Sequence, residues 1–218
     1  MYQFHVADDH PLFRNAMSDV IDIHFPNSNI TTSSALEETI TALKDNSEID
    51  ILFLDLNMPG SEDLFGLISV RRNFPEVPVV IVSGWQDQRI IARAVGHGAS
   101  GFIPKSLPTE TIVDAINQIL RGEHWTPIDS AHLELSAPDA SELDIAHRIS
   151  TLTTQQHKVL SSLKEGQLNK QIAYDLGITE ATVKAHISAI FKKLQVANRT
   201  QAVVALSKIS LTHEQKDN

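Results

Sequence analysis

The chain has 218 residues, of which 42% are hydrophobic and 21% charged, so it is long enough for two domains and too apolar for general disorder. It contains no cysteine, which excludes disulfide scaffolds, thiolate zinc sites, iron–sulfur clusters and thiol catalysis. A formal net charge of -9 argues against nucleic-acid binding by the molecule as a whole. No apolar run approaches the roughly 20 residues of a membrane-spanning helix, so we expect a cytoplasmic protein with no membrane partner.

The first 122 residues alternate short apolar runs with amphipathic stretches. Strict alternation of strands and helices predicts a five-stranded, parallel, doubly wound α/β domain over residues 1–122. We expect strands at residues 2–7, 29–33, 50–55, 77–83 and 99–103, and helices at residues 11–25, 36–45, 64–74, 88–95 and 109–120.

Residues 123–150 contain Pro127, Pro138 and scattered acids without a sustained period, so we expect a linker with one short helix over residues 142–148. The remainder, residues 151–218, reads as a compact all-α domain of four helices. Its helices are expected at residues 153–165, 169–176, 180–194 and 199–209.

Charge divides along the same boundaries. Residues 1–122 carry a net charge of -8, the linker -5, and residues 151–218 carry +4. A basic C-terminal domain is therefore masked by an acidic remainder, and nucleic-acid binding by that domain stays open.

Polar side chains follow the strands of the first domain at the points where the strands end. Asp8 and Asp9 follow the first strand, Asp55 the third, Ser83 the fourth and Lys105 the fifth. Carboxyl ends of parallel strands form the ligand-binding edge of an open sheet, so these side chains should converge. Clustered carboxylates repel each other unless a hard cation such as Mg²⁺ joins them, and such a site can make one carboxylate a nucleophile towards a phosphoryl group.

Three other interpretations of these residues are possible. Each Asp taken singly is more simply a cap of a helix or turn, and it is their coincidence that favours a site. A phosphatase of the haloacid-dehalogenase type also uses an Asp nucleophile with Mg²⁺, but it expects a second Asp where this chain has Asn57. A dinucleotide-binding module would need G-x-G-x-x-G after the first strand, which is missing.

Residues 1–122 resemble a bacterial response-regulator receiver domain, which has a flavodoxin-like fold. The resemblance is carried by Asp8-Asp9, by the run Asp55-Leu56-Asn57-Met58-Pro59-Gly60, by Ser83-Gly84, and by Gly98-Ala99-Ser100-Gly101-Phe102-Ile103-Pro104-Lys105.

The resemblance implies a role for each matched residue. Asp55 would accept the phosphoryl group, without making the protein an enzyme in the usual sense. The remaining roles are Mg²⁺ binding by Asp8, Asp9, Asp55 and the Asn57 main-chain carbonyl, phosphoryl contacts by Ser83 and Lys105, and switching by Ser83 and Phe102.

The chain departs from the receiver pattern at two places. Asp63 stands where the family usually has Gly, so the loop beside Asp55 is expected to differ in shape. Ser106 follows Lys105 where many receivers have Pro, which makes a cis peptide improbable there. Trp85 lies two residues past Ser83, and we expect its bulk to shield an acyl phosphate from water.

Residues 169–194 have the plan of a helix-turn-helix, with one helix against the scaffold and a second helix for the major groove. Helical spacing leaves Lys184, Ala185 and Ser188 on an outward face, as candidates for contacts with base edges. We expect phosphate contacts from a second group, namely Lys170, Thr182, His186, Lys193 and Arg199.

The segment 152–203 resembles the LuxR-type DNA-binding domain, with its densest matches at Asn169–Ala173, Thr182–His186 and Lys193–Thr200. One family acid is replaced by Gln156, which removes an expected salt bridge inside the domain. The resemblance implies that the last helix helps to pair two domains on DNA.

Together the halves resemble a two-component response regulator of the NarL/FixJ type. Its implied partners are a sensor histidine kinase, promoter DNA and, in the active form, a second copy, with RNA polymerase as a further candidate. Phosphorylation would either pair the receivers or release the basic domain. The alternative is an atypical receiver that works without phosphate, to which Asp63 gives some weight.

Overall fold

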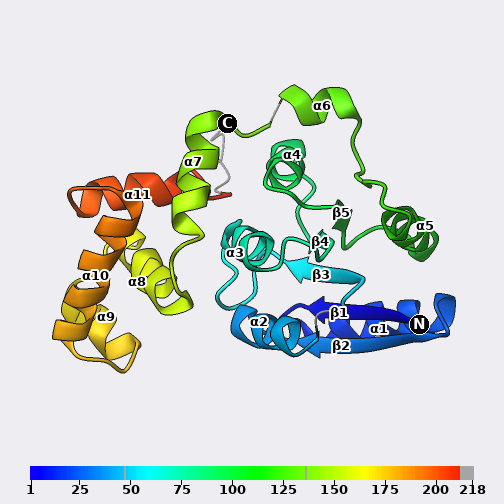
Figure 1. The fold of residues 1–218 in the computed structure, drawn as a ribbon, viewed down its shortest axis with the longest axis horizontal. Helices are drawn as coiled ribbons and strands as arrows, with labels where there is room; N and C mark the ends of the chain where they lie inside the picture. The colour runs from blue at the N-terminus through cyan, green and yellow to red at the C-terminus, as the bar shows by residue number, and fades with distance from the viewer. Residues whose placement is uncertain (47, 136, 212–218) are drawn as a thin grey trace. The chain divides into compact units, whose positions relative to one another are not determined.

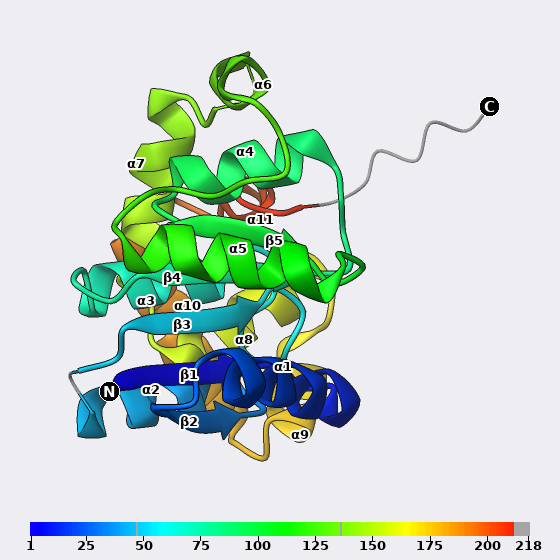
Figure 2. The ribbon, with the colours of Figure 1, turned by 90° about the vertical axis from the view of Figure 1, so that its right-hand side faces the viewer.

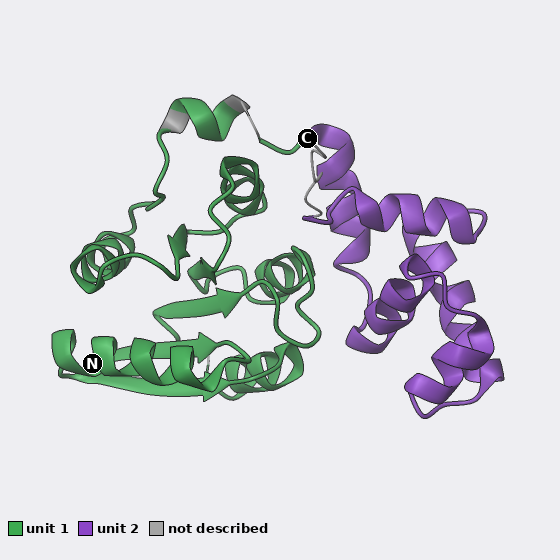
Figure 3. Cartoon of the chain, turned by 180° about the vertical axis from the view of Figure 1, so that it is seen from behind, with its two compact units in different colours: residues 1–138 green, residues 139–218 purple. Residues whose placement is uncertain are grey.

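A computed structural model describes residues 1–46, 48–135 and 137–211. The chain folds into two compact units, residues 1–138 and residues 139–218 (Figure 3). The first unit therefore includes much of the linker, and the second begins directly after Pro138.

The first unit is a five-stranded sheet in the order β2-β1-β3-β4-β5, and every neighbouring pair is parallel. Helices α1 and α5 lie on one face of the sheet, and α2, α3 and α4 on the other (Figures 1 and 2). The strands are β1 (Tyr2–Ala7), β2 (Ser28–Ser33), β3 (Ile51–Asp55), β4 (Val79–Ser83) and β5 (Gly101–Pro104). The helices are α1 (Pro11–His24), α2 (Leu36–Asp45), α3 (Phe65–Asn73), α4 (Gln88–Gly96), α5 (Thr109–Leu120) and α6 (Ser130–Leu135).

The predicted architecture is confirmed, and the bounds differ by two residues or fewer at almost every end. Every residue of β3 and β4 is buried, as expected for strands covered by helices on both faces. Phe4, Phe53 and Ile116 belong to the core between the sheet and the helices α1 and α5. The rigid centre of this sheet positions the residues that follow its strand ends.

The second unit contains α7 (Ala140–Ile149), α8 (Thr154–Lys164), α9 (Asn169–Asp175), α10 (Glu180–Leu194) and α11 (Arg199–Ser207). The four predicted helices are present, and α7 adds a fifth because it packs against α10 and α11. The helix expected over residues 142–148 is present as α7, although it belongs to the second unit, and α6 was not anticipated. Among the described residues, no helix is both long and apolar enough to span a membrane.

Candidate functional site

The carboxyl ends of β1, β3, β4 and β5 border a cleft of about 380 Å³. The parallel register explains the convergence, because Ala7 pairs with Leu54 and Asp55 pairs with Val82 at the same edge of the sheet. The cleft is lined by His10, Leu12, Phe13, Asp55, Asn57, Gly84, Trp85 and Lys105.

Lys105 joins the buried carboxylates. Its Nζ lies 2.6 Å from Asp8 Oδ2 and 3.3 Å from Asp55 Oδ1, and it also stands 4.8 Å from the centre of the Phe13 ring. Burial raises the pKa of Asp55, and the Asp8 carboxylate acts in the same direction, whereas Lys105 opposes both. The lysine therefore favours the ionised carboxylate that a nucleophile requires.

The donor set suits a hard divalent cation. Asp8, Asp9, His10 and Asp55 each offer a ligand atom, and these atoms all lie within 4.8 Å of one another. Asp55 Oδ2 is buried without a hydrogen-bond partner among the described residues, as a carboxylate oxygen reserved for a cation would be. The predicted residues thus fit Mg²⁺ at this position.

Sequence reasoning missed His10, Leu12 and Phe13 as cleft residues. The Nδ1 of His10 lies 2.7 Å from Asp9 Oδ1 and 3.1 Å from Asp8 Oδ1. The only available signal was that these three residues come directly after the acidic pair.

The predicted switch residues, Ser83 and Phe102, are both fully buried. The Ser83 Oγ accepts a hydrogen bond from the Trp85 main chain at 3.2 Å, and the Ser83 carbonyl accepts one from the Lys105 main chain at 2.8 Å. Phe102 pairs with Ile81 across the sheet, two strand positions from the pair of Ser83 with Pro104. A displacement of Ser83 would therefore also displace the end of β5.

The loop beside Asp55 accommodates Asp63 in a left-handed conformation with φ of 57°. This is a conformation that glycine adopts most easily and that Asp tolerates better than most residues. The loop is also tied to the strand, because the Ser61 Oγ donates to the Asp55 carbonyl at 3.1 Å. Asp63 therefore has a backbone conformation that is also open to glycine, and the expected difference in loop shape stays a prediction.

The second unit presents the predicted helix-turn-helix as α9 and α10. Thr179 caps α10, its Oγ1 accepting from the Thr182 main chain at 3.1 Å. Lys184, Ala185 and Ser188 are exposed on α10, as predicted from their spacing. Thr182 and His186 are half-buried beside them.

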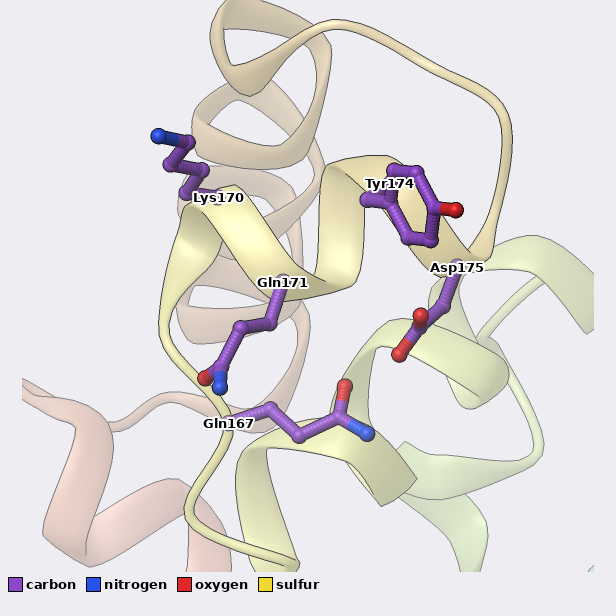
Figure 4. Close-up of a pocket in the computed structure, with 5 residues that line it drawn as sticks. All are labelled: Gln167, Lys170, Gln171, Tyr174 and Asp175. Carbon is purple, nitrogen blue, oxygen red and sulfur yellow. The ribbon is translucent and has the colours of Figure 1, made fainter.

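The exposed side of α9 borders a shallow cleft of about 350 Å³, lined by Gln167, Lys170, Gln171, Tyr174 and Asp175 (Figure 4). Lys170 is exposed and extends away from the helix, and Tyr174 is 87% exposed. An exposed lysine is free to reach a phosphate, whereas Tyr174 was not predicted as a surface feature.

Lys193 and Arg199 are engaged inside the unit. Lys193 Nζ donates to the Thr151 carbonyl at 2.6 Å and to Gln156 Oε1 at 2.7 Å. Arg199 donates to the carbonyls of Leu163 at 3.1 Å and Gln167 at 2.8 Å. Both cations therefore tie helices together, a role that the sequence did not indicate for either.

Two family models match the chain. Residues 4–117 match the response regulator receiver domain, and residues 150–206 match the bacterial regulatory proteins of the luxR family. The chain thus belongs to the two-component response regulators of the NarL/FixJ type and is a DNA-binding transcriptional regulator.

Full-length relatives share this plan. The chain is 42% identical to the glycerol metabolism activator of Pseudomonas putida over 216 residues, which is 97% of this chain and 98% of the relative. It is 29% identical to the nitrate/nitrite response regulator protein NarL of Escherichia coli, covering 91% of this chain and 92% of NarL.

Solved structures support the fold. RcsB from Salmonella enterica serovar Typhimurium, bound to promoter P1flhDC in the presence of phosphomimetic BeF₃⁻, matches with a TM-score of 0.56 at 19% identity, covering 96% of this chain and 99% of RcsB. A LuxR family DNA-binding response regulator from Silicibacter pomeroyi matches with a TM-score of 0.51 at 24% identity, covering 58% of this chain and 97% of that protein.

Proposed function

We propose that this regulator is switched by transfer of a phosphoryl group from a sensor histidine kinase to Asp55. The observation that carries the proposal is the pairing of Lys105 Nζ with Asp8 at 2.6 Å and with Asp55 at 3.3 Å, at the strand ends where Ser83 is buried. That arrangement provides a nucleophile, a cation to balance its charge and a hydroxyl to bond a phosphoryl oxygen.

In the transfer, one Asp55 oxygen forms a bond to phosphorus while the bond from phosphorus to the kinase imidazole nitrogen breaks. The product is an acyl phosphate. Lys105 pairs with a phosphoryl oxygen, and the Ser83 hydroxyl donates to another. Mg²⁺, held by Asp8, Asp9, Asp55 and the Asn57 carbonyl, would neutralise negative charge on the transferring oxygens.

On DNA, we infer that Lys184, Ala185 and Ser188 face base edges while Lys170, Thr182 and His186 face phosphates. Two copies would bind together, with α11 contributing to their contact. The name of the Pseudomonas putida relative supports activation of transcription, and RNA polymerase would then be a further partner.

The test is a selection of DNA from a random library with full-length protein, with and without acetyl phosphate and Mg²⁺. Mass spectrometry of the same samples reports phosphorylation of Asp55. We expect the wild type to gain the mass of one phosphoryl group and to change its DNA affinity, and Asp55→Asn to do neither. Equal affinity of the phosphorylated and unphosphorylated wild type would refute the regulatory part of the proposal.

The alternative is a receiver that works without phosphate. Absence of added mass on the wild type with a competent donor and Mg²⁺ would favour it. The left-handed backbone at Asp63 weighs against it, because glycine also adopts this conformation.

A further inference from the structure

The start of the linker is attached to the edge strand β5. Trp125 forms a parallel bridge with Gly101, its main-chain N–H donating to the Ser100 carbonyl at 3.3 Å and its carbonyl accepting from the Phe102 N–H at 3.0 Å. The Trp125 side chain also packs against the core between the sheet and the helices α1 and α5. The main chain of the predicted switch residue is thus hydrogen-bonded to the linker itself.

Gly101 permits this close approach. A Cβ at that position would lie 3.1 Å from the Trp125 carbonyl oxygen and 2.8 Å from Ile119 Cδ1. A larger residue there would require the end of the Ile119 side chain to move and the Trp125 carbonyl to shift by a few tenths of an ångström. The glycine that opens β5 therefore allows the close approach of the linker to the strand.

The later part of the linker is attached to α4. Helix α6 packs on α4, above it in Figure 2. At the end of α4, a Cβ added to Gly96 would lie 2.6 Å from Pro138 Cγ and closer still to Pro138 Cδ. The proline ring therefore occupies the space that any other residue at position 96 would need.

Charge favours the same contact. The segment from Glu123 to Pro138 contains three acids and no Lys or Arg, whereas α4 carries Arg89 and Arg93 and no acid. Arg93 is half-buried on the helix that α6 covers. The acidic linker thus covers a basic helix.

We propose that residues 123–135 and 137–138, called here the tether, are the output element of the receiver. The tether is held on β5 and α4 in the unphosphorylated chain, and it loosens when phosphorylation of Asp55 moves Ser83 and Phe102. This inference rests on the proposed function. Its consequence is direct, because Pro138 precedes Asp139, the residue that caps the first helix of the DNA-binding unit.

The first test is hydrogen exchange of the full-length protein with and without BeF₃⁻ and Mg²⁺, a stable stand-in for the phosphoryl group. We expect slower exchange around Asp55 and about fivefold faster exchange at Phe102 and Trp125, the factor that about 1 kcal/mol of lost hydrogen bonding gives. Amides of β2, at the opposite edge of the sheet, serve as the control and should not change.

The two proposals can fail separately in this experiment. Slower exchange around Asp55 with an unchanged tether would overturn the tether proposal and leave phosphorylation standing. No change in exchange around Asp55 would count against phosphorylation at that residue. The tether proposal is then tested by variants that need no phosphoryl mimic.

The variant is Gly96→Ala, which should displace Pro138 without any donor. We expect faster exchange in the tether and a DNA affinity, for duplex recovered from the selection, equal to that of wild type with BeF₃⁻ and Mg²⁺. The double variant Gly96→Ala/Pro138→Ala removes the clashing ring atoms and should restore wild-type behaviour, and Gln88→Ala, at the opposite end of α4, is the matched control. An unchanged tether, or a released tether with unchanged DNA affinity, would overturn the proposal.

Discussion

Lys193 offers a sharp test of the structure, because two roles for it predict different results. If Lys193 contacts a phosphate, its replacement should weaken DNA binding and leave the stability of the protein unchanged. In the structure, however, its ammonium donates to the Thr151 carbonyl and to the buried Gln156, which joins the end of α10 to the start of α8. We therefore expect Lys193→Ala to destabilise the second unit.

The expected loss is about 2 kcal/mol, since hydrogen bonds to a charged group contribute about 1.5–3 kcal/mol and the partners left behind can recover some solvation. Both tryptophans, Trp85 and Trp125, lie in the first unit, so their fluorescence in urea reports that unit alone. Helical circular dichroism reports both units. Lys193→Ala should lower the urea midpoint for unfolding of the second unit, followed by circular dichroism, by about 1–2 M. The midpoint followed by fluorescence should not change.

Lys192 is the matched control, because it is the neighbouring lysine on α10 and is exposed. Lys192→Ala should leave both transitions unchanged. A Lys193→Ala protein that unfolds at the same urea concentrations as wild type, yet binds DNA more weakly, would refute the structural role of Lys193. That result would favour its role as a phosphate contact.

Three further predictions concern different parts of the chain. Burial lowers the pKa of His5 to about 4, so as pH falls below 6.5 the unfolded chain takes up a proton on His5 before the folded chain does. The free energy of unfolding of the first unit should therefore fall by about 2 kcal/mol between pH 7.5 and pH 5. Urea unfolding followed by tryptophan fluorescence checks this, and a His5→Gln protein with the same pH dependence would contradict it. Trp85→Ala should shorten the lifetime of the acyl phosphate several-fold, measured by loss of the added mass, and an unchanged half-life would end the shielding hypothesis. Lys170→Ala should weaken binding to all duplexes and reduce the slope of log affinity against log salt concentration by about 1, whereas Lys184→Ala should relax sequence preference. Identical behaviour of the two variants in a binding selection would disprove the assignment of Lys170 to phosphates and Lys184 to base edges.

Much of the fold followed from short-range patterns. The buried strands β3 and β4 are continuous apolar runs, and helices such as α10 begin at a capping threonine and keep a regular apolar spacing. The cleft was predictable for a topological reason: parallel strands place the residues after their ends at one edge, so Asp8, Asp55 and Lys105 meet although they are far apart in sequence.

What escaped prediction depends on long-range contacts. Lys193 and Gln156 are 37 positions apart, and only the packing of α10 on α8 shows that one serves the other. Helix α6 is short and follows a proline, so it has too few residues to show a helical period. The bridge of Trp125 to Gly101 likewise has no local pattern, because a single paired residue does not make a strand.

The strengths of these contacts suggest a direction for the signal. Moving a two-state equilibrium from mostly off to mostly on takes about 5.5 kcal/mol. Two or three charge-assisted contacts from Ser83 and Lys105 to a phosphoryl group, at about 1.5–3 kcal/mol each, can supply that amount. The two main-chain hydrogen bonds at Trp125 contribute only about 1 kcal/mol each. Since the cleft can gain more than the edge of β5 can lose, charge added at Asp55 should release the tether. The coupling is reciprocal, but a loosened tether alone returns only about 2 kcal/mol, too little to move the cleft from mostly off to mostly on.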